Sequence, residues 1–311
     1  MNPRIKPNRL SKGDRIGVVF PTSPCDPSLL NHGVERLRSL GFEPVLIGES
    51  YGCSEPRHLF SGASPSERAS DLMKAFKDPS IKAIFCARGA FGSMEILPLL
   101  DFRVIRENKK ALVGFSDITP LLLAISEKSG LVTVHGPMIS GGFANSSCPE
   151  SSRSVEELIS LLCGTTKNPF EGVKLERISP ATASEGVLMG GSLTMISSIM
   201  GTPWEPEFAG KILFLEDVGE KPYRIYRMLL QLELAGKLDI VSGVVLGSFT
   251  DCTHHSGPTV EDVFKHVFAG KEYPVLIGAS FGHCPLNLAV PLGVTARLRD
   301  GMIEIMEYTV E

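Results

Sequence analysis

The chain has 311 residues, of which 43% are hydrophobic and 21% are charged, a composition typical of a globular protein with a sizeable core. The formal net charge of −4 provides no concentration of positive charge, so nucleic acid and anionic membrane surfaces are not expected partners. No run approaches the ~20 apolar residues of a membrane span, and the N-terminus lacks the apolar segment of a secretory signal. A length about twice that of a typical domain favours two domains.

Seven cysteines are spread along the sequence without a Cys-x-x-Cys pair, at positions 25, 53, 86, 148, 163, 252 and 284. An odd number with this spacing favours reduced thiols over a disulfide framework or a zinc site. We therefore expect a cytoplasmic protein.

The first half alternates short apolar runs with helical patterns. Ser64 and Glu67 fit a capping box and Pro65 stands at the first helical position of one such pattern. Alternating β and α units predict a parallel sheet with helices on both faces. The strands are expected at 15–21, 43–48, 81–88, 111–116 and 131–137, and the helices at 28–41 and 64–78.

The middle of the chain changes character, with many turn formers and no sustained period. We predict an N-terminal α/β domain over 1–165, a linker over 166–185 and a C-terminal domain over 186–311. The C-terminal domain is expected to hold helices at 192–200 and 222–236 and strands at 211–217 and 243–249. Asp300-Gly301 lies between two apolar runs and predicts a β-hairpin.

Ser116 permits two interpretations. Ser116-Asp117 precede an apolar helical run over 118–125, and both residue types are preferred helix N-caps, so the pattern alone favours a cap. A serine on a tight strand-to-helix turn is also a candidate nucleophile, with Gly114 relieving the crowding of the turn. The G-x-S-x-G signature is not satisfied, because Ile118 replaces its second glycine. A nucleophilic serine needs a base and a group that orients the base.

His135 lies at the end of one predicted strand, His283 follows another, and both are candidates for the base. His254 and His255 lie near Asp251 and Cys252, but this spacing does not suit a metal ion, so no metal site is expected. For the orienting acid, Glu216-Asp217 directly follow four apolar residues, which predicts that at least one carboxylate is drawn inward and needs a partner. The remaining histidines lie in patterns typical of the surface: His32, His58 and His266.

The chain resembles the LD-carboxypeptidase family of serine peptidases, which includes muramoyl-tetrapeptide carboxypeptidases and microcin immunity peptidases. The resemblance covers nearly the whole length and keeps the order and spacing of the family's motifs. It is carried by CARGAFGSMEILPLLD, LVGFSDITPLLLAI, VTVHGPM, GVLMGGSLTMISSIMGTPW, ILFLEDVGEKPYRIYRMLLQL and GHCPLNLAVPLG.

The resemblance implies a triad in which Ser116 is the nucleophile, Glu216 the acid and His283 the base. It makes His135 a neighbour of the site. It also implies a Rossmann-like N-terminal sheet layer, a β-rich swivelling C-terminal α/β domain, usually a homodimer, and neither metal nor cofactor. The backbone N–H groups of Asp117 and Ala90 are the implied oxyanion donors.

This chain departs from the family's usual residues at three positions. The RGGYG loop reads Arg88 to Gly92 with Ala90 at its centre, so an oxyanion site that needs positive φ there would be distorted. Ser192 stands where asparagine is common, and we expect it to contact substrate. Tyr226 replaces an aspartate on a helix. Arg88 is our candidate for binding the terminal carboxylate of the substrate, since guanidinium groups bind carboxylates in a bidentate way.

The predicted function is a serine carboxypeptidase that cleaves the terminal D-alanine from murein tetrapeptide in cell-wall recycling. The alternative within the family is a microcin-immunity peptidase that cleaves a peptide–nucleotide antibiotic. An alternative of another class is a non-catalytic nucleotide binder using the RGAFG loop, although this loop lacks the full G-x-G-x-x-G pattern. A thiol hydrolase based on Cys284 is disfavoured, because adjacent strand residues point to opposite faces.

Overall fold

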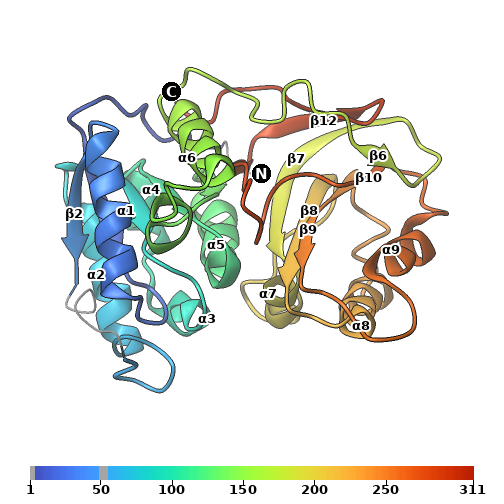
Figure 1. The fold of residues 1–311 in the computed structure, drawn as a ribbon, viewed down its shortest axis with the longest axis horizontal. Helices are drawn as coiled ribbons and strands as arrows, with labels where there is room; N and C mark the ends of the chain where they lie inside the picture. The colour runs from blue at the N-terminus through green and yellow to red at the C-terminus, as the bar shows by residue number, and fades with distance from the viewer. Residues whose placement is uncertain (1–3, 49–54) are drawn as a thin grey trace.

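A computed structural model describes residues 4–48 and 55–311, and Cys53 lies outside them. Two sheets stand side by side with helices around them (Figure 1). The first part of the chain contains β1 (Arg15–Val19), α1 (Pro27–Ser39), β2 (Glu43–Ile47), α2 (Pro65–Lys77), β3 (Ile81–Cys86), α3 (Ser93–Ile96), α4 (Phe102–Glu107), β4 (Ala111–Gly114), α5 (Thr119–Ser129), β5 (Thr133–His135) and α6 (Pro149–Leu162).

The second part contributes most of the other sheet. Its elements are β6 (Glu176–Arg177), β7 (Ala183–Ser192), α7 (Leu193–Ile199), β8 (Lys211–Val218), α8 (Pro222–Leu234), β9 (Gly243–Thr250), α9 (Val260–Phe268), β10 (Val275–Ile277), β11 (Val290–Leu292), β12 (Thr295–Arg299) and β13 (Met302–Ile305).

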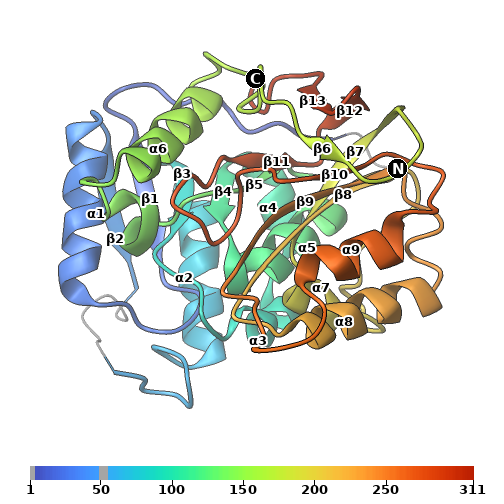
Figure 2. The same ribbon diagram turned by 45° about the vertical axis from the view of Figure 1, so that its right-hand side comes forward.

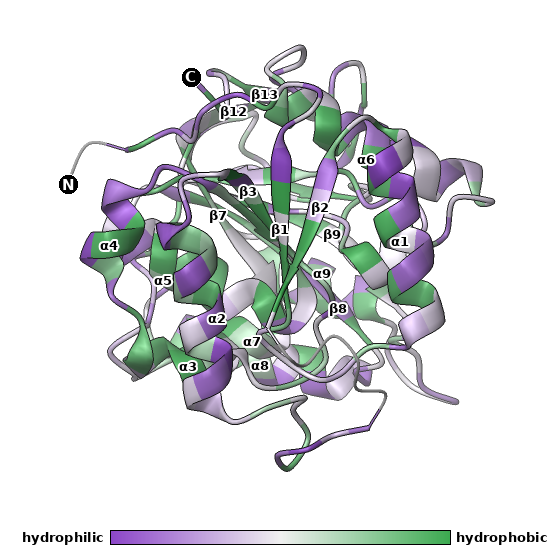
Figure 3. Ribbon diagram, turned by 90° about the vertical axis from the view of Figure 1, so that its left-hand side faces the viewer, coloured by the Kyte–Doolittle hydropathy of each residue, from purple (hydrophilic) through white to green (hydrophobic). Residues whose placement is uncertain are grey.

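Within the described residues, the first sheet has six strands in the order β11-β5-β4-β3-β1-β2, parallel apart from β11. Its strands are almost continuously buried, as expected of a parallel sheet with both faces covered. Helices α1 and α6 pack on one face, where a separate apolar core forms, and α2 and α5 pack on the other. Figure 3 shows hydrophobic strands between helices whose outer faces are largely hydrophilic.

The second sheet, in the part of the chain that the structure describes, has seven strands in the order β13-β12-β7-β8-β9-β10-β6, and β7 to β10 are parallel. The apolar core beneath α2 and α5 continues into this sheet and its helices α7, α8 and α9. The α/β fold with a parallel first sheet and a β-rich second part is therefore confirmed. The predicted hairpin at Asp300-Gly301 is also confirmed, since β12 and β13 pair on either side of it.

Two strands, β7 and β11, are placed differently from the sequence-based expectation. Strand β7 begins at Ala183, inside the predicted linker, and its glycines hide the strand pattern. A Cβ on Gly190 would lie 1.9 Å from the carbonyl oxygen of Phe214, so only glycine permits β8 to approach this closely. Strand β11 belongs to the predicted C-terminal domain but pairs with β5 of the first sheet (Figure 2).

Helix α2 forms as predicted, with reciprocal hydrogen bonds between Ser64 and Glu67 completing the capping box. Within the described part of the chain, every cysteine is a free thiol. None of the helices in that part combines the length and the apolar character needed to cross a bilayer.

Candidate active site

Ser116 lies on a strained turn between β4 and α5. Phe115 is extended, Ser116 has a φ of 63°, and a short 3-10 turn leads into the helix. Positive φ at a residue other than glycine costs about 1–3 kcal/mol and is concentrated at functional sites. The Ser116 side chain accepts no hydrogen bond from the helix amides, so the N-cap interpretation is wrong. Gly114 is required, since a Cβ there would lie 2.8 Å from the Ile118 side chain.

The hydroxyl of Ser116 points instead to His283. Oγ lies 3.0 Å from His283 Nε2, across a sequence separation of 167 residues. His283 is in the loop that follows β10, and its preceding Gly282 has a φ of 99°. A Cβ on Gly282 would lie 2.5 Å from Glu216 Oε2, so glycine allows the imidazole to approach the acid on β8.

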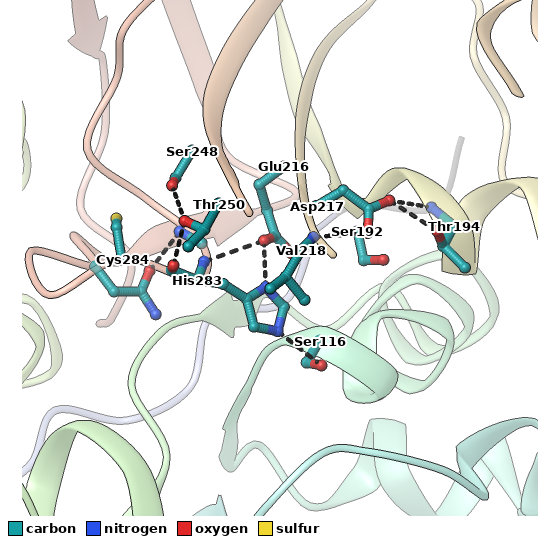
Figure 4. A network of polar contacts seen from close by, with 12 residues as sticks. Ser116, Ser192, Thr194, Glu216, Asp217, Val218, Ser248, Thr250, His283 and Cys284 are labelled. Carbon is teal, nitrogen blue, oxygen red and sulfur yellow. Dashed lines mark hydrogen bonds and ion pairs between the residues drawn. The ribbon is translucent and has the colours of Figure 1, made fainter. Parts of the chain in front are cut away.

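Glu216 is fully buried and holds the other ring nitrogen of His283. Its Oε2 lies 2.6 Å from His283 Nδ1 and 3.2 Å from the backbone nitrogen of His283, which donates to it. Burial raises the pKa of Glu216, and the hydrogen bonds and charge of His283 oppose that rise. A proton held on Nδ1 by the carboxylate leaves Nε2 free to accept the proton of Ser116. Figure 4 shows the three side chains in one row.

His135 lies beside this row but is not part of it. It is fully buried, and burial lowers its pKa to about 3, so it is neutral. Its ring packs against Phe214 and Phe281 and also against Phe115, whose ring centroid lies 4.8 Å from that of His283. His135 therefore supports the wall behind the catalytic candidates.

The loop that carries Ala90 passes close to Ser116. A Cβ on Gly89 would lie 2.9 Å from the Ser116 Cβ and 3.3 Å from the backbone nitrogen of Asp117. Ala90 adopts a φ of 83°, so this position does use the region that glycine occupies freely. The chain accommodates alanine there in a strained conformation, directly after Gly89, which lies against the nucleophile turn.

Replacing Ala90 with glycine is expected to raise the free energy of unfolding by about 0.5–1 kcal/mol. Relief of the left-handed alanine is worth ~1–2 kcal/mol, and the extra backbone freedom of glycine in the unfolded chain offsets ~0.5–1 kcal/mol. Urea denaturation measures the change. The control is Ala269→Gly, at a position with a φ of −58°, which should destabilise instead. Equal losses at both positions would contradict the assignment of strain.

Asp117 connects the nucleophile turn to the same loop. Its buried carboxylate accepts a hydrogen bond from the Ser93 backbone nitrogen at 2.9 Å. Beneath the loop, the buried Arg68 donates to the carbonyls of Pro21, Ala63 and Gly92 and pairs with Glu95. Burial raises the pKa of Asp117 to about 6, against the lowering effects of Ser93 and Arg68.

The difference in the free energy of unfolding between Asp117→Asn and the natural protein is expected to grow in favour of the variant as the pH rises. The carboxyl has a pKa near 3.8 in the unfolded chain and about 6 in the folded protein. Its ionisation therefore lowers the free energy of unfolding progressively as the pH rises from 4 to 6. An amide avoids this cost, giving a difference of up to about 3 kcal/mol above pH 6 and little near pH 4. Urea denaturation of both proteins at pH 4.5 and 7.5 measures it; a difference independent of pH would refute the interpretation.

The other candidate residues occupy different places. Arg88 is exposed, donates to the Pro24 carbonyl at 2.7 Å, and lines a cavity of about 540 Å³ together with Ala90. Ser192 is buried at the end of β7, where its hydroxyl accepts from the Met195 amide and caps α7. Substrate contacts of Arg88 and Ser192 stay predictions.

Three further side chains singled out in the sequence do not join the row. The Cys284 thiol donates to the Leu286 carbonyl, and burial raises its pKa. Tyr226 on α8, which stands where the family commonly has aspartate, contacts His266 on α9, with 3.3 Å between Oη and Nε2. This residue therefore links α8 to α9. His254 is exposed with its ring bonded to the Ser256 carbonyl, and no cluster of ligands suited to a metal is found in residues 4–48 and 55–311.

Comparisons with known proteins agree on one family. The family model of the LD-carboxypeptidase N-terminal domain matches residues 16–136, and that of the C-terminal domain matches residues 185–298. A probable murein peptide carboxypeptidase of Bacillus subtilis is 36% identical over 304 residues, covering 94% of this chain and 91% of the relative.

Solved structures of two kinds share the fold. The muramoyltetrapeptide carboxypeptidase of Oxalobacter formigenes has a TM-score of 0.82 at 31% identity, covering 94% of this chain and 99% of the other. An inactive mutant of the microcin C7 self-immunity protein has a TM-score of 0.87 at 26% identity, covering 99% and 100%.

Proposed function

Because the chain belongs to the LD-carboxypeptidase family, we propose that it is a serine carboxypeptidase that removes the terminal D-alanine of a murein tetrapeptide. The observation that carries the proposal is the hydrogen-bonded row of Ser116, His283 and Glu216. Such a row turns a weakly nucleophilic hydroxyl into an attacking group.

In the acylation step, His283 Nε2 takes the proton of Ser116 as Oγ attacks the amide carbonyl. Glu216 stabilises the resulting imidazolium from the side of Nδ1. The backbone N–H groups of Asp117 and Ala90 donate to the developing oxyanion in this proposal, supported by the close approach of Gly89, which precedes Ala90, to Ser116 and the Asp117 nitrogen. Donors fixed in place in this way lower the barrier, because they need little reorganisation during the reaction.

Collapse of the tetrahedral intermediate breaks the amide bond. His283 passes its proton to the departing amine, and the acyl group stays on Ser116 Oγ. Water, deprotonated by His283, then attacks the acyl carbon and releases the shortened peptide. The neutral His135 takes no part in proton transfer, because its pKa lies far below neutrality.

The murein substrate is supported by the names of relatives that cover nearly all of this chain. A microcin-type activity is the second candidate, supported by the likeness to the self-immunity protein. The test is to incubate the protein with a synthetic murein tetrapeptide and with a peptide–nucleotide antibiotic and to weigh the products. We expect loss of one alanine from the tetrapeptide. Cleavage of the antibiotic alone would replace the first candidate by the second.

We further propose that the enzyme works in the cytoplasm as a homodimer, in recycling of cell-wall peptides. The support is the reduced state of the described cysteines together with the family resemblance. Sedimentation equilibrium tests the dimer, and a monomer across the micromolar range would refute it.

A further inference from the structure

A cavity of about 420 Å³ lies against His283 and has no part in the mechanism above. We call it the His283 pocket; its walls include Phe115, Gly141, Asn145, Ser151, His283 and Asn287. Among the described residues that line it there is no lysine, arginine, aspartate or glutamate. The volume falls at the small end of the range for ligand pockets and suits a single amino acid.

The chemistry of acyl transfer places the departing residue on this side. The imidazole that deprotonates the serine must later reach the leaving nitrogen, so this nitrogen lies next to Nε2 of His283. The larger cavity lined by Arg88 and Ala90 lies instead along the loop beside Ser116. The acyl part of the peptide therefore extends along that loop, and the departing residue enters the His283 pocket.

Two independent features suit the carboxylate of a C-terminal residue. Helix α6 has 14 residues, and the positive end of its dipole lies near Ser151. The exposed Glu150 carboxylate already bonds the first-turn backbone there, so a substrate carboxylate shares this end of the helix with it. Asn287 is only 4% exposed; its Oδ1 accepts from the Gly282 amide, and its Nδ2 has no partner within the described residues. A buried donor left unpaired costs about 1–3 kcal/mol and calls for an acceptor.

We propose that the His283 pocket binds the departing C-terminal amino acid, a small residue such as alanine, with its carboxylate near the start of α6 and the Asn287 amide. The proposal rests on acyl transfer by Ser116. It moves recognition of the terminal carboxylate away from Arg88, which then contacts the acyl portion.

Filling the pocket tests the proposal. A Cβ on Gly141 would meet no atom within 4 Å, so Gly141→Leu adds volume at the wall without a clash at its base. We expect kcat/KM for the tetrapeptide to fall at least about tenfold, the loss that crowding of one pocket produces. Labelling of Ser116 by a small fluorophosphonate should be unchanged, because its fluoride leaving group needs no pocket. Gly270→Leu, in the loop after α9 and equally free of clashes, is the matched control.

Asn287→Asp tests the carboxylate contact separately. Aspartate retains an acceptor for the Gly282 amide but places a negative charge against the terminal carboxylate. KM for the acid-terminated peptide should rise at least about tenfold, with a smaller rise for the same peptide ending in a carboxamide. A purely structural role would raise both values equally.

The outcomes separate the pocket from the catalytic proposal. Failure of the unaltered protein to label at Ser116 would remove the catalytic proposal itself. Normal labelling of Gly141→Leu together with unchanged turnover of the tetrapeptide would overturn only the assignment of the pocket. Equal loss of labelling and turnover would also overturn it, since the effect would then not be specific to the departing residue.

Discussion

Ser116→Ala is expected to lower kcat for the tetrapeptide by a factor of about 10⁴ or more, with little change in Tm. The hydroxyl is the group that contacts His283 Nε2 at 3.0 Å, and removal of a triad serine in other hydrolases costs this much or more. Alanine can occupy the same backbone conformation at a strain cost similar to that of serine. Turnover assays and thermal melts measure both quantities.

The matched control for this variant is Ser198→Ala. The Ser198 hydroxyl is exposed on α7 and donates to the Thr194 carbonyl, away from His283. It should leave kcat unchanged. Activity of Ser116→Ala within tenfold of the natural protein would refute the nucleophile assignment.

Glu216→Gln is expected to lower kcat by about 10⁴-fold while the protein stays folded. A neutral amide does not stabilise the imidazolium, and an amide nitrogen turned toward Nδ1 forces the proton onto Nε2, which is the wrong tautomer. Stability should change little or rise, because burial already disfavours the charge of Glu216. Turnover and thermal melts again provide the measurement.

Asp217→Asn is the control for the acid. Asp217 adjoins Glu216 and is also buried, but its carboxylate accepts from the Thr194 amide and hydroxyl instead of from His283. We expect kcat to fall less than tenfold for this variant. Equal losses in the two variants would mean that Glu216 has no special relation to the imidazole.

The sequence predicted the strands of the first sheet and the helices α1, α2 and α5 well, because buried parallel strands and amphipathic helices leave strong patterns, but it did not predict α6. At Ser116 the local pattern alone favoured a helix cap, whereas the family resemblance named this serine the nucleophile; the backbone conformation directs its hydroxyl toward His283. The sequence pattern also missed β7, since Gly190 and Gly191 interrupt the apolar run while allowing β8 to approach. Local patterns do not record such close approaches between strands.

The hydrogen bonds of the buried Arg68 below the site were also missed, although the position of this arginine in its helix was a signal for them. Arg68 lies four residues before Leu72, on the apolar face of α2, and an arginine on a buried face requires partners. Its partners lie in loops distant in sequence, around Pro21 and Gly92, so they could not be named without coordinates. The His283 pocket could not be predicted for the same reason, because two of its lining residues, Gly141 and Asn287, lie far apart in the sequence.

Covalent labelling tests the central claim most directly. The protein is treated with a fluorophosphonate, digested, and analysed by mass spectrometry to locate the modified residue. We expect one adduct on Ser116, formed much more slowly when His283 is replaced by alanine. An active preparation that shows no adduct, or one whose adduct lies on another residue, would contradict the proposed mechanism.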